Sequence, residues 1–126
     1  MTLYAIDSSV WIEYFDGTSK GQLISQLIEK ESLRTSILAM AEIADSFARD
    51  NRDCTELVEF VKSRSTIVQL SIPLSLRAAI LKKSIRKQKP KFGLADAIHL
   101  ATAEQERAIL LTMDHDFQGT PNTKVV

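Results

Sequence analysis

The sequence predicts a three-layer α/β fold, because short apolar segments alternate with longer segments of helical periodicity. The apolar segments at residues 3–6 and 108–112 have the length of buried strands. Segments between them repeat their apolar residues at the 3.6-residue period of an amphipathic helix. Strands that alternate with helices favour a parallel sheet with helices on both faces. A length of 126 residues fits a single domain spanning 1–126.

The chain begins with a strand that leads directly into a helix. Residues 3–6 form the predicted strand, and residues 8–15 form the helix. Asp7 or Ser8 is suited to cap this helix, and Gly17 follows its end. The first functional side chains therefore stand at a strand-to-helix junction.

A second pair of elements follows the first helix. Ser19 and Gln22 form a capping-box pattern that opens another helix. Its apolar residues follow the helical period at Leu23, Ile24, Leu27 and Ile28. The next predicted elements are a brief strand at 33–35, a helix at 37–49, and a helix from the capping box at 53–56 to about residue 64.

The second half of the chain repeats this alternation. A strand is predicted at 67–70, and Pro73 suits the first turn of the next helix. That helix ends near Pro90, because proline disfavours helix in the residue before it. The remaining elements are a helix at 94–106, the strand at 108–112, and an edge strand at 124–126.

Four acidic residues stand where folding would bring separate segments together. Asp7 follows the first strand, and Asp114 follows the strand at 108–112. Ligands of an open α/β sheet bind outside the carboxyl ends of its strands, so both carboxylates would lie there. Glu42 and Asp96, on two helices, complete the set. Carboxylate oxygens suit Mg²⁺ or Mn²⁺, so the sequence predicts a divalent metal site.

Each acid also has a purely structural interpretation. Asp7 would cap a helix, and Glu42 shares a helical stripe with other charged residues. Asp96 would interact favourably with a helix N-terminus, and Asp114 and Asp116 would form Asx turns. The metal hypothesis depends on the four acids taken together.

Four segments of the chain resemble, in order, the motifs of one ribonuclease family. They are AIDSS at 5–9, AEI at 41–43, GLADAIHLATA at 93–103 and LTMDHDF at 111–117. The resemblance is to the PIN-domain ribonucleases of the VapC toxin group, and it covers essentially the full length. The third and fourth segments are the most specific. Met113 departs from the family, which usually has a polar residue there.

The resemblance implies a five-stranded parallel sheet in which the first and fourth strands are neighbours. It implies that Asp7 and Asp114 face each other and that the protein is a Mg²⁺- or Mn²⁺-dependent endoribonuclease. It also implies a small antitoxin that blocks the site, and a homodimer. The residues carried over as metal-binding and catalytic are Asp7, Glu42, Asp96 and Asp114, with Asp116 ranked below them as a metal ligand and Ser8 and Thr112 in support.

The mechanistic hypothesis is hydrolysis of a phosphodiester by water that one or two metal ions activate. Six basic residues between 82 and 91 would neutralise RNA phosphates, although a solvated helix surface explains them equally well. His99 is either a ligand or general base, or a hydrogen-bonded packing residue, and its apolar neighbours favour packing. Cys54 is not expected to act as a nucleophile.

The composition excludes several classes of protein. Sixteen basic and sixteen acidic residues cancel, so nothing favours a general attraction to nucleic acid or membranes. Cys54 is the only cysteine, which fits a reducing compartment. The sequence has neither a signal peptide nor a spanning segment, so a soluble, cytoplasmic protein is expected.

Other protein classes also place acids after the strands of an α/β sheet. A dehalogenase-type phosphatase needs a second acid where Ser9 stands, and a receiver domain needs an aspartate after the third strand, where the sequence has Leu70 and Ser71. A structure-specific DNA nuclease would share the same chemistry. The main alternative from another class is a non-catalytic PIN-fold module that binds RNA or protein, which would normally lack one or more of the acids.

Overall fold

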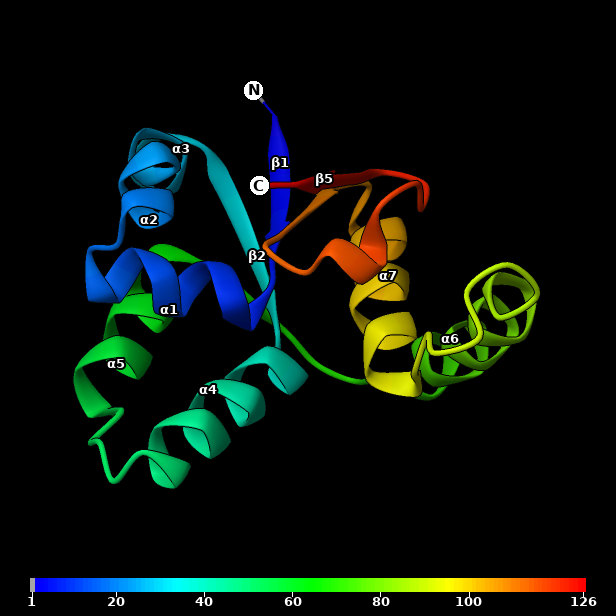
Figure 1. Cartoon of the computed structure of the whole chain (residues 1–126), viewed down its shortest axis with the longest axis horizontal. Coiled ribbons are helices and arrows are strands. Elements are labelled where there is room, and N and C mark those ends of the chain that lie inside the picture. The colour runs from blue at the N-terminus through cyan, green and yellow to red at the C-terminus, as the bar shows by residue number, and fades with distance from the viewer. Residues whose placement is uncertain (1) are drawn as a thin grey trace.

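The computed structural model describes residues 2–126 and has a five-stranded parallel sheet as its middle layer (Figure 1). The strands are β1 (Leu3–Ile6), β2 (Ser32–Ser36), β3 (Thr66–Val68), β4 (Ile109–Thr112) and β5 (Thr123–Val125). Their order in the sheet is β3-β2-β1-β4-β5. The predicted α/β fold, with the first and fourth strands adjacent, is confirmed.

The pairing of β1 with β4 is the switch point of the sheet. The chain proceeds outward from β1 to β3 on one side, and from β4 to β5 on the other. In the parallel register Ala5 pairs with Leu110 and Ile6 pairs with Leu111. The amide of Asp7 then donates to the carbonyl of Leu111 (3.0 Å). Asp7 and the residues after β4 therefore share the carboxyl edge of the sheet.

Helices cover both faces of the sheet, with α6 and α7 on one side and α1 to α5 on the other (Figure 1). Their bounds are α1 (Ser8–Asp16), α2 (Ser19–Leu23), α3 (Ser25–Lys30), α4 (Ile37–Arg49), α5 (Thr55–Arg64), α6 (Ile72–Ile85) and α7 (Leu94–Glu106), with a 3₁₀ turn, η1 (His115–Phe117). Within residues 2–126, no helix combines the length and apolarity needed to cross a membrane.

The alternation of side chains along the strands separates two hydrophobic cores. Ala5 and Leu110 pack under α6 and α7, whereas Ile6 and Leu111 pack on the opposite side. Neighbouring residues of a strand point to opposite faces, so each buried strand contributes to both cores. Trp11 anchors the second core. It is fully buried, and its indole nitrogen donates to Oγ1 of Thr35 (3.1 Å).

The helix predicted to start at Ser19 is in fact two short helices. The N-cap of α2 is Thr18, whose hydroxyl accepts from the amide of Gly21 (3.1 Å). The helix breaks at Ile24, which separates α2 from α3. The break buries Ile24 while Leu23 remains 78% exposed, so the apolar pattern alone did not predict it.

Several other boundaries also differ from prediction. β3 ends at Val68, two residues earlier than predicted. At the predicted capping box, the N-cap of α5 is Cys54, which makes no side-chain capping bond, and the hydroxyl of Thr55 donates to Oδ1 of Asp53. The largest difference is that α6 ends at Ile85 instead of near Pro90. The chain then turns so that Phe92 is buried against the core. Proline cannot continue a helix, so a turn before Pro90 both ends α6 and allows Phe92 to be buried.

Gly21 is predicted to be essential for stability, because α2 packs directly against the backbone of α1. A Cβ at this position would lie 2.1 Å from the carbonyl oxygen of Glu13. Gly21→Ala should therefore lower the free energy of unfolding by about 1–3 kcal/mol, measured by chemical denaturation. The exposed neighbour substitution Lys20→Ala should change it by less than about 0.5 kcal/mol. Equal stabilities for the two variants would contradict this packing.

Candidate metal centre

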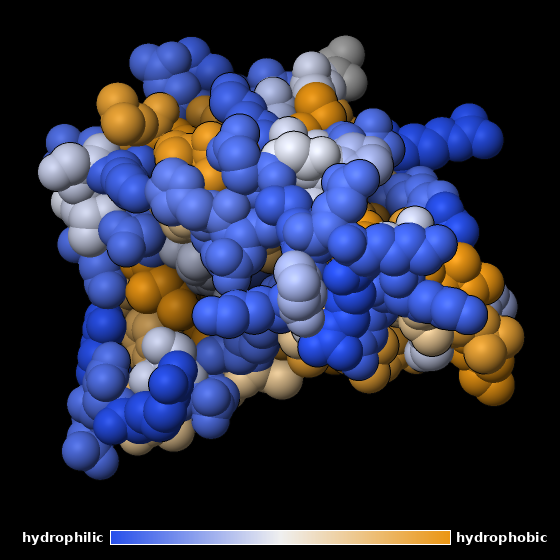
Figure 2. All heavy atoms as spheres, turned by 45° about the vertical axis from the view of Figure 1, so that its right-hand side comes forward, coloured by the Kyte–Doolittle hydropathy of each residue, from blue (hydrophilic) through white to orange (hydrophobic). Residues whose placement is uncertain are grey.

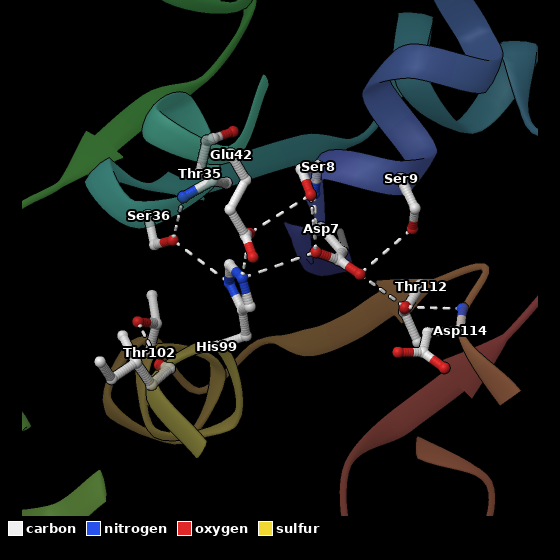
Figure 3. Close-up of polar contacts among 12 residues, drawn as sticks. Asp7, Ser8, Ser9, Thr35, Ser36, Glu42, His99, Thr102, Thr112 and Asp114 are labelled. Atoms are coloured by element: carbon white, nitrogen blue, oxygen red, sulfur yellow. Dashed lines mark hydrogen bonds and ion pairs between the residues drawn. The ribbon is translucent and has the colours of Figure 1, made fainter. Parts of the chain in front are cut away.

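Asp7 is the buried acid around which the centre is organised (Figure 3). Its Oδ1 accepts a hydrogen bond from the amide of Ser8 (2.7 Å), which caps α1. Its Oδ2 accepts from the hydroxyls of Thr112 (2.7 Å) and Ser9 (3.1 Å). The capping and site interpretations of Asp7 are therefore compatible, since one carboxylate oxygen serves the helix and the other faces β4.

Thr112 connects Asp7 to Asp114. The Thr112 hydroxyl is buried, donates to Asp7 and accepts from the amide of Asp114 (3.0 Å). Oδ1 of Asp114 in turn accepts from the amide of Asp116 (2.9 Å). Asp116 is exposed on η1 and contacts Asp114 through its backbone. The first and fourth strands thus present two acids at one edge, with Asp116 outside them.

Glu42 reaches the same edge from α4 through Ser8 and His99. Its Oε1 accepts from the hydroxyl of Ser8 (3.3 Å) and from Nε2 of His99 (2.6 Å). Nε2 of His99 also lies 3.6 Å from Oδ1 of Asp7. One ligand atom from each of Asp7, Glu42 and His99 lies within 4.8 Å of the others, a spacing that could hold a metal ion.

The local structure of α4 explains why Glu42 points inward. Ser36 caps the helix by accepting from the amide of Ala39 (3.0 Å), and its Oγ lies 3.3 Å from Nδ1 of His99. The side chain of Glu42 is 36% exposed, whereas Asp45 on the predicted charged stripe is 74% exposed and pairs with Arg49. Of the two acids on this stripe, Glu42 therefore faces the centre and Asp45 faces the solvent.

Asp96 approaches the centre from the first turn of α7. Its Oδ2 accepts from the amide of Gly93 (2.8 Å), and the carboxylate is partly buried. Burial raises the pKa of Asp96; the Gly93 bond opposes the shift, and the charges of Asp114 and Asp7 add to it. Those neighbouring charges indicate that the acids are close enough to repel one another.

His99 partly offsets this negative charge. Burial opposes protonation of the ring, but the bond to Glu42 and the charges of Asp7, Glu42 and Asp96 outweigh it, so the pKa of His99 is raised. Within residues 2–126, neither lysine nor arginine forms an ion pair with any of the four acids. A cation at this edge would relieve the remaining repulsion.

The PIN domain family matches residues 4–122 of the chain. The chain belongs to this family. The sequence-based recognition of a PIN domain is therefore confirmed, and the match includes all four acids. No curated protein sequence matches the chain.

Solved structures share the PIN fold over nearly the whole chain. A toxin-antitoxin complex from Klebsiella pneumoniae aligns with a TM-score of 0.74 at 24% identity, covering 99% of this chain and 97% of that one. VapBC2 from Rickettsia felis, bound to a promoter DNA fragment, also aligns at 0.74, with 16% identity and 99% and 98% coverage. VapC20 from Mycobacterium tuberculosis, a toxin that cleaves the sarcin-ricin loop, aligns at 0.72, with 14% identity and 94% and 95% coverage. Similarity at these identities concerns the fold.

The donor set of this PIN domain fits a hard divalent cation. Carboxylate oxygens of Asp7 and Glu42 converge within reach of one ion, and Asp96 and Asp114 lie beside them. Such oxygens suit Mg²⁺ and Mn²⁺. His99 holds the carboxylate of Glu42, the kind of supporting contact that orients ligands around a metal.

Sequence reasoning missed part of this network. His99 was interpreted as a packing residue, and it is indeed buried and hydrogen-bonded, but its partners belong to the centre. The available signal was its position one turn after Asp96. Ser9 and Ser36 had no signal that linked them to the centre, because the contacts that do so, from Ser9 to the amide of Met113 and from Ser36 to His99, join segments far apart in the chain.

The raised pKa of His99 predicts a pH-dependent contribution to stability without metal. Protonated His99 stabilises the fold fully below its unfolded pKa of about 6.5. That contribution is lost as the pH rises through the higher folded pKa. In EDTA, the difference in unfolding free energy between wild type and His99→Asn should shrink from about pH 6 upward. Chemical denaturation across pH measures it, and a constant difference would contradict the proposed charge pairing.

Proposed function

We propose that this PIN domain is a metal-dependent endoribonuclease that hydrolyses phosphodiester bonds in RNA, with a Mg²⁺ or Mn²⁺ cofactor. One observation carries the proposal: the carboxylates of Asp7 and Glu42 converge within reach of one ion, and the charges of Asp7 and Asp114 act on the carboxylate of Asp96. A structural role alone does not require this arrangement, because it leaves like charges near one another at a partly buried site.

The residues of the centre have separable roles in this proposal. A bound divalent ion supplies Lewis-acid chemistry that activates water and neutralises charge on the phosphodiester. Thr112, Ser8 and Ser9 hold Asp7 in one orientation, and His99 holds Glu42. These fixed carboxylates need little rearrangement to serve as ligands.

Asp96 is the residue best suited to accept the proton that the attacking water releases. Without metal, burial and the neighbouring acids raise its pKa, and a raised pKa favours proton acceptance. Its backbone partner, the amide of Gly93, occupies Oδ2 and fixes the carboxylate at the start of α7.

Asp96→Asn is predicted to abolish cleavage while leaving the fold intact. Purified protein is incubated with labelled single-stranded RNA in EDTA, Mg²⁺ or Mn²⁺. Wild type should cleave only with metal, and the variant should be at least about 100-fold slower. Asp45→Asn, an exposed aspartate on α4, is the matched control and should retain activity. Absence of cleavage by wild type across several RNAs, with no metal bound in calorimetry, would favour the binding module.

We also propose that the protein is the toxin of a toxin-antitoxin pair in the cytoplasm, with residues 1–126 forming its single domain. The similar structures described as toxin-antitoxin and VapBC complexes support a small antitoxin protein as partner. An antitoxin that covers the carboxyl edge of the sheet would block access of RNA to the four acids.

A homodimer is part of the same proposal, and an exposed apolar stripe on α6 supports it. Ile72, Leu76 and Ile80 are 77%, 64% and 60% exposed. Their four-residue spacing puts them on one face of the helix. Figure 2 shows a largely hydrophilic face on which hydrophobic side chains gather at the lower right. Contiguous exposed apolar surface of this kind favours association.

Leu76→Glu is predicted to shift the protein from dimer to monomer. A charge in the middle of the α6 stripe would be desolvated in a dimer, so association should weaken by about tenfold or more. Sedimentation velocity measures the change. Leu23→Glu, a similarly exposed leucine on α2, is the control and should leave association unchanged. A monomeric wild type, or a dimer insensitive to Leu76→Glu, would contradict this interface.

A further inference from the structure

A pocket of about 310 Å³ opens between the turn that joins α6 to α7 and the 3₁₀ turn η1. Of the candidate metal-binding residues, only Asp116 belongs to it. Its lining consists of Lys89, Pro90, Lys91, Phe92, His115 and Asp116. The pocket therefore combines two cations, one carboxylate, an imidazole and apolar walls.

Hydrogen bonds join both sides of this pocket to the metal centre. On one side, the amide of Asp116 donates to Oδ1 of Asp114 (2.9 Å). On the other side, Gly93 follows the pocket residue Phe92, and its amide donates to Oδ2 of Asp96 (2.8 Å). A ligand in the pocket would consequently lie next to the acids of the centre.

The floor of the pocket is fixed. Phe92 and Phe117 are 2% and 1% exposed, and their rings meet edge to face, 5.6 Å apart at 78°. The turn above them is closed by backbone bonds from Phe92 to Lys89 (3.0 Å) and from Lys89 to Ile85 (2.9 Å). The lining residues are thus held on a rigid support, a condition for selective binding.

The lysines of the lining complement a phosphate group, whereas its one carboxylate, Asp116, lies on η1. Within the described chain, residues 2–126, the ammonium groups of Lys89 and Lys91 form no ion pair. The adjoining acids repel an RNA backbone, so cations beside them are needed to hold its phosphates. His115 is exposed and offers a planar ring, and Pro90 adds an apolar wall. Bases of single-stranded RNA stack on rings of this type.

We infer that this pocket binds one nucleotide of single-stranded RNA beside the scissile phosphate, with its base on His115 and a phosphate on Lys89 and Lys91. The inference rests on the proposed nuclease function and gives that function a position-selecting subsite. Duplex RNA keeps its bases stacked and would not fill the pocket. Cleavage would therefore favour unpaired segments.

The test measures binding separately from cleavage. Fluorescence anisotropy with a labelled single-stranded oligoribonucleotide in EDTA reports binding. His115→Ala should weaken binding about tenfold, and His115→Phe, which keeps a flat ring, should bind like wild type. Lys91→Ala should lower the slope of log affinity against log salt by about 0.7. Lys30→Ala, an exposed lysine on α3, is the control and should change neither quantity.

Separate outcomes distinguish this inference from the proposed function. Unchanged affinity in His115→Ala, or equal loss in His115→Ala and His115→Phe, would overturn the stacking subsite even if wild type cleaves RNA. Failure of wild type to bind the oligonucleotide would overturn it as well. Binding that depends on His115 and Lys91 without any cleavage in Mg²⁺ or Mn²⁺ would support the subsite while rejecting the nuclease. As a control, Mg²⁺ binding is measured by calorimetry. If His115→Ala binds Mg²⁺ as wild type does, the substitution has left Asp114 undisturbed.

Discussion

The parallel pairing of β1 with β4 is the constraint on which the rest of the structure depends. It aligns Ile6 with Leu111, so the next residue, Asp7, meets the carboxyl end of β4. The Thr112 hydroxyl then bridges Asp7 and the amide of Asp114. A shift of one residue would turn Leu111 out of its core and break this bridge, because neighbouring side chains of a strand point to opposite faces. The packing of Leu111 and the hydrogen bonds of Thr112 therefore require the same register of β1 and β4.

The centre is built from helix starts as much as from strand ends. Asp7 caps α1 and Ser36 caps α4. Asp96 accepts a hydrogen bond from the amide of Gly93, the residue that precedes α7. Helix N-termini stabilise negative charge, which helps to explain how several carboxylates are tolerated close together. Capping and metal binding were alternative interpretations of Asp7 from the sequence alone. In the folded protein the two interpretations are compatible, since a cap fixes the orientation that the proposed ligand requires.

His99 shows how a buried network adjusts to uncompensated charge. Its ring lies between the carboxylates of Asp7 and Glu42 and is held from behind by Ser36. Burial alone would favour neutral imidazole, yet the surrounding acids raise its pKa. The early end of α6 also affects the surroundings of the acids. By turning before Pro90, the chain buries Phe92 and leaves two lysines beside the acids.

The sequence by itself determined the α/β fold, the family and the bounds of several elements, including α4 and α7, because apolar periodicity and strand-end residues are local signals. It also indicated that Asp7 and Asp114 would share one edge. Only the tertiary structure decided that Glu42 turns inward while Asp45 stays exposed, that Ile24 breaks a helix, and that His99 joins the acids. These outcomes depend on contacts between residues far apart in the chain, which no local pattern encodes.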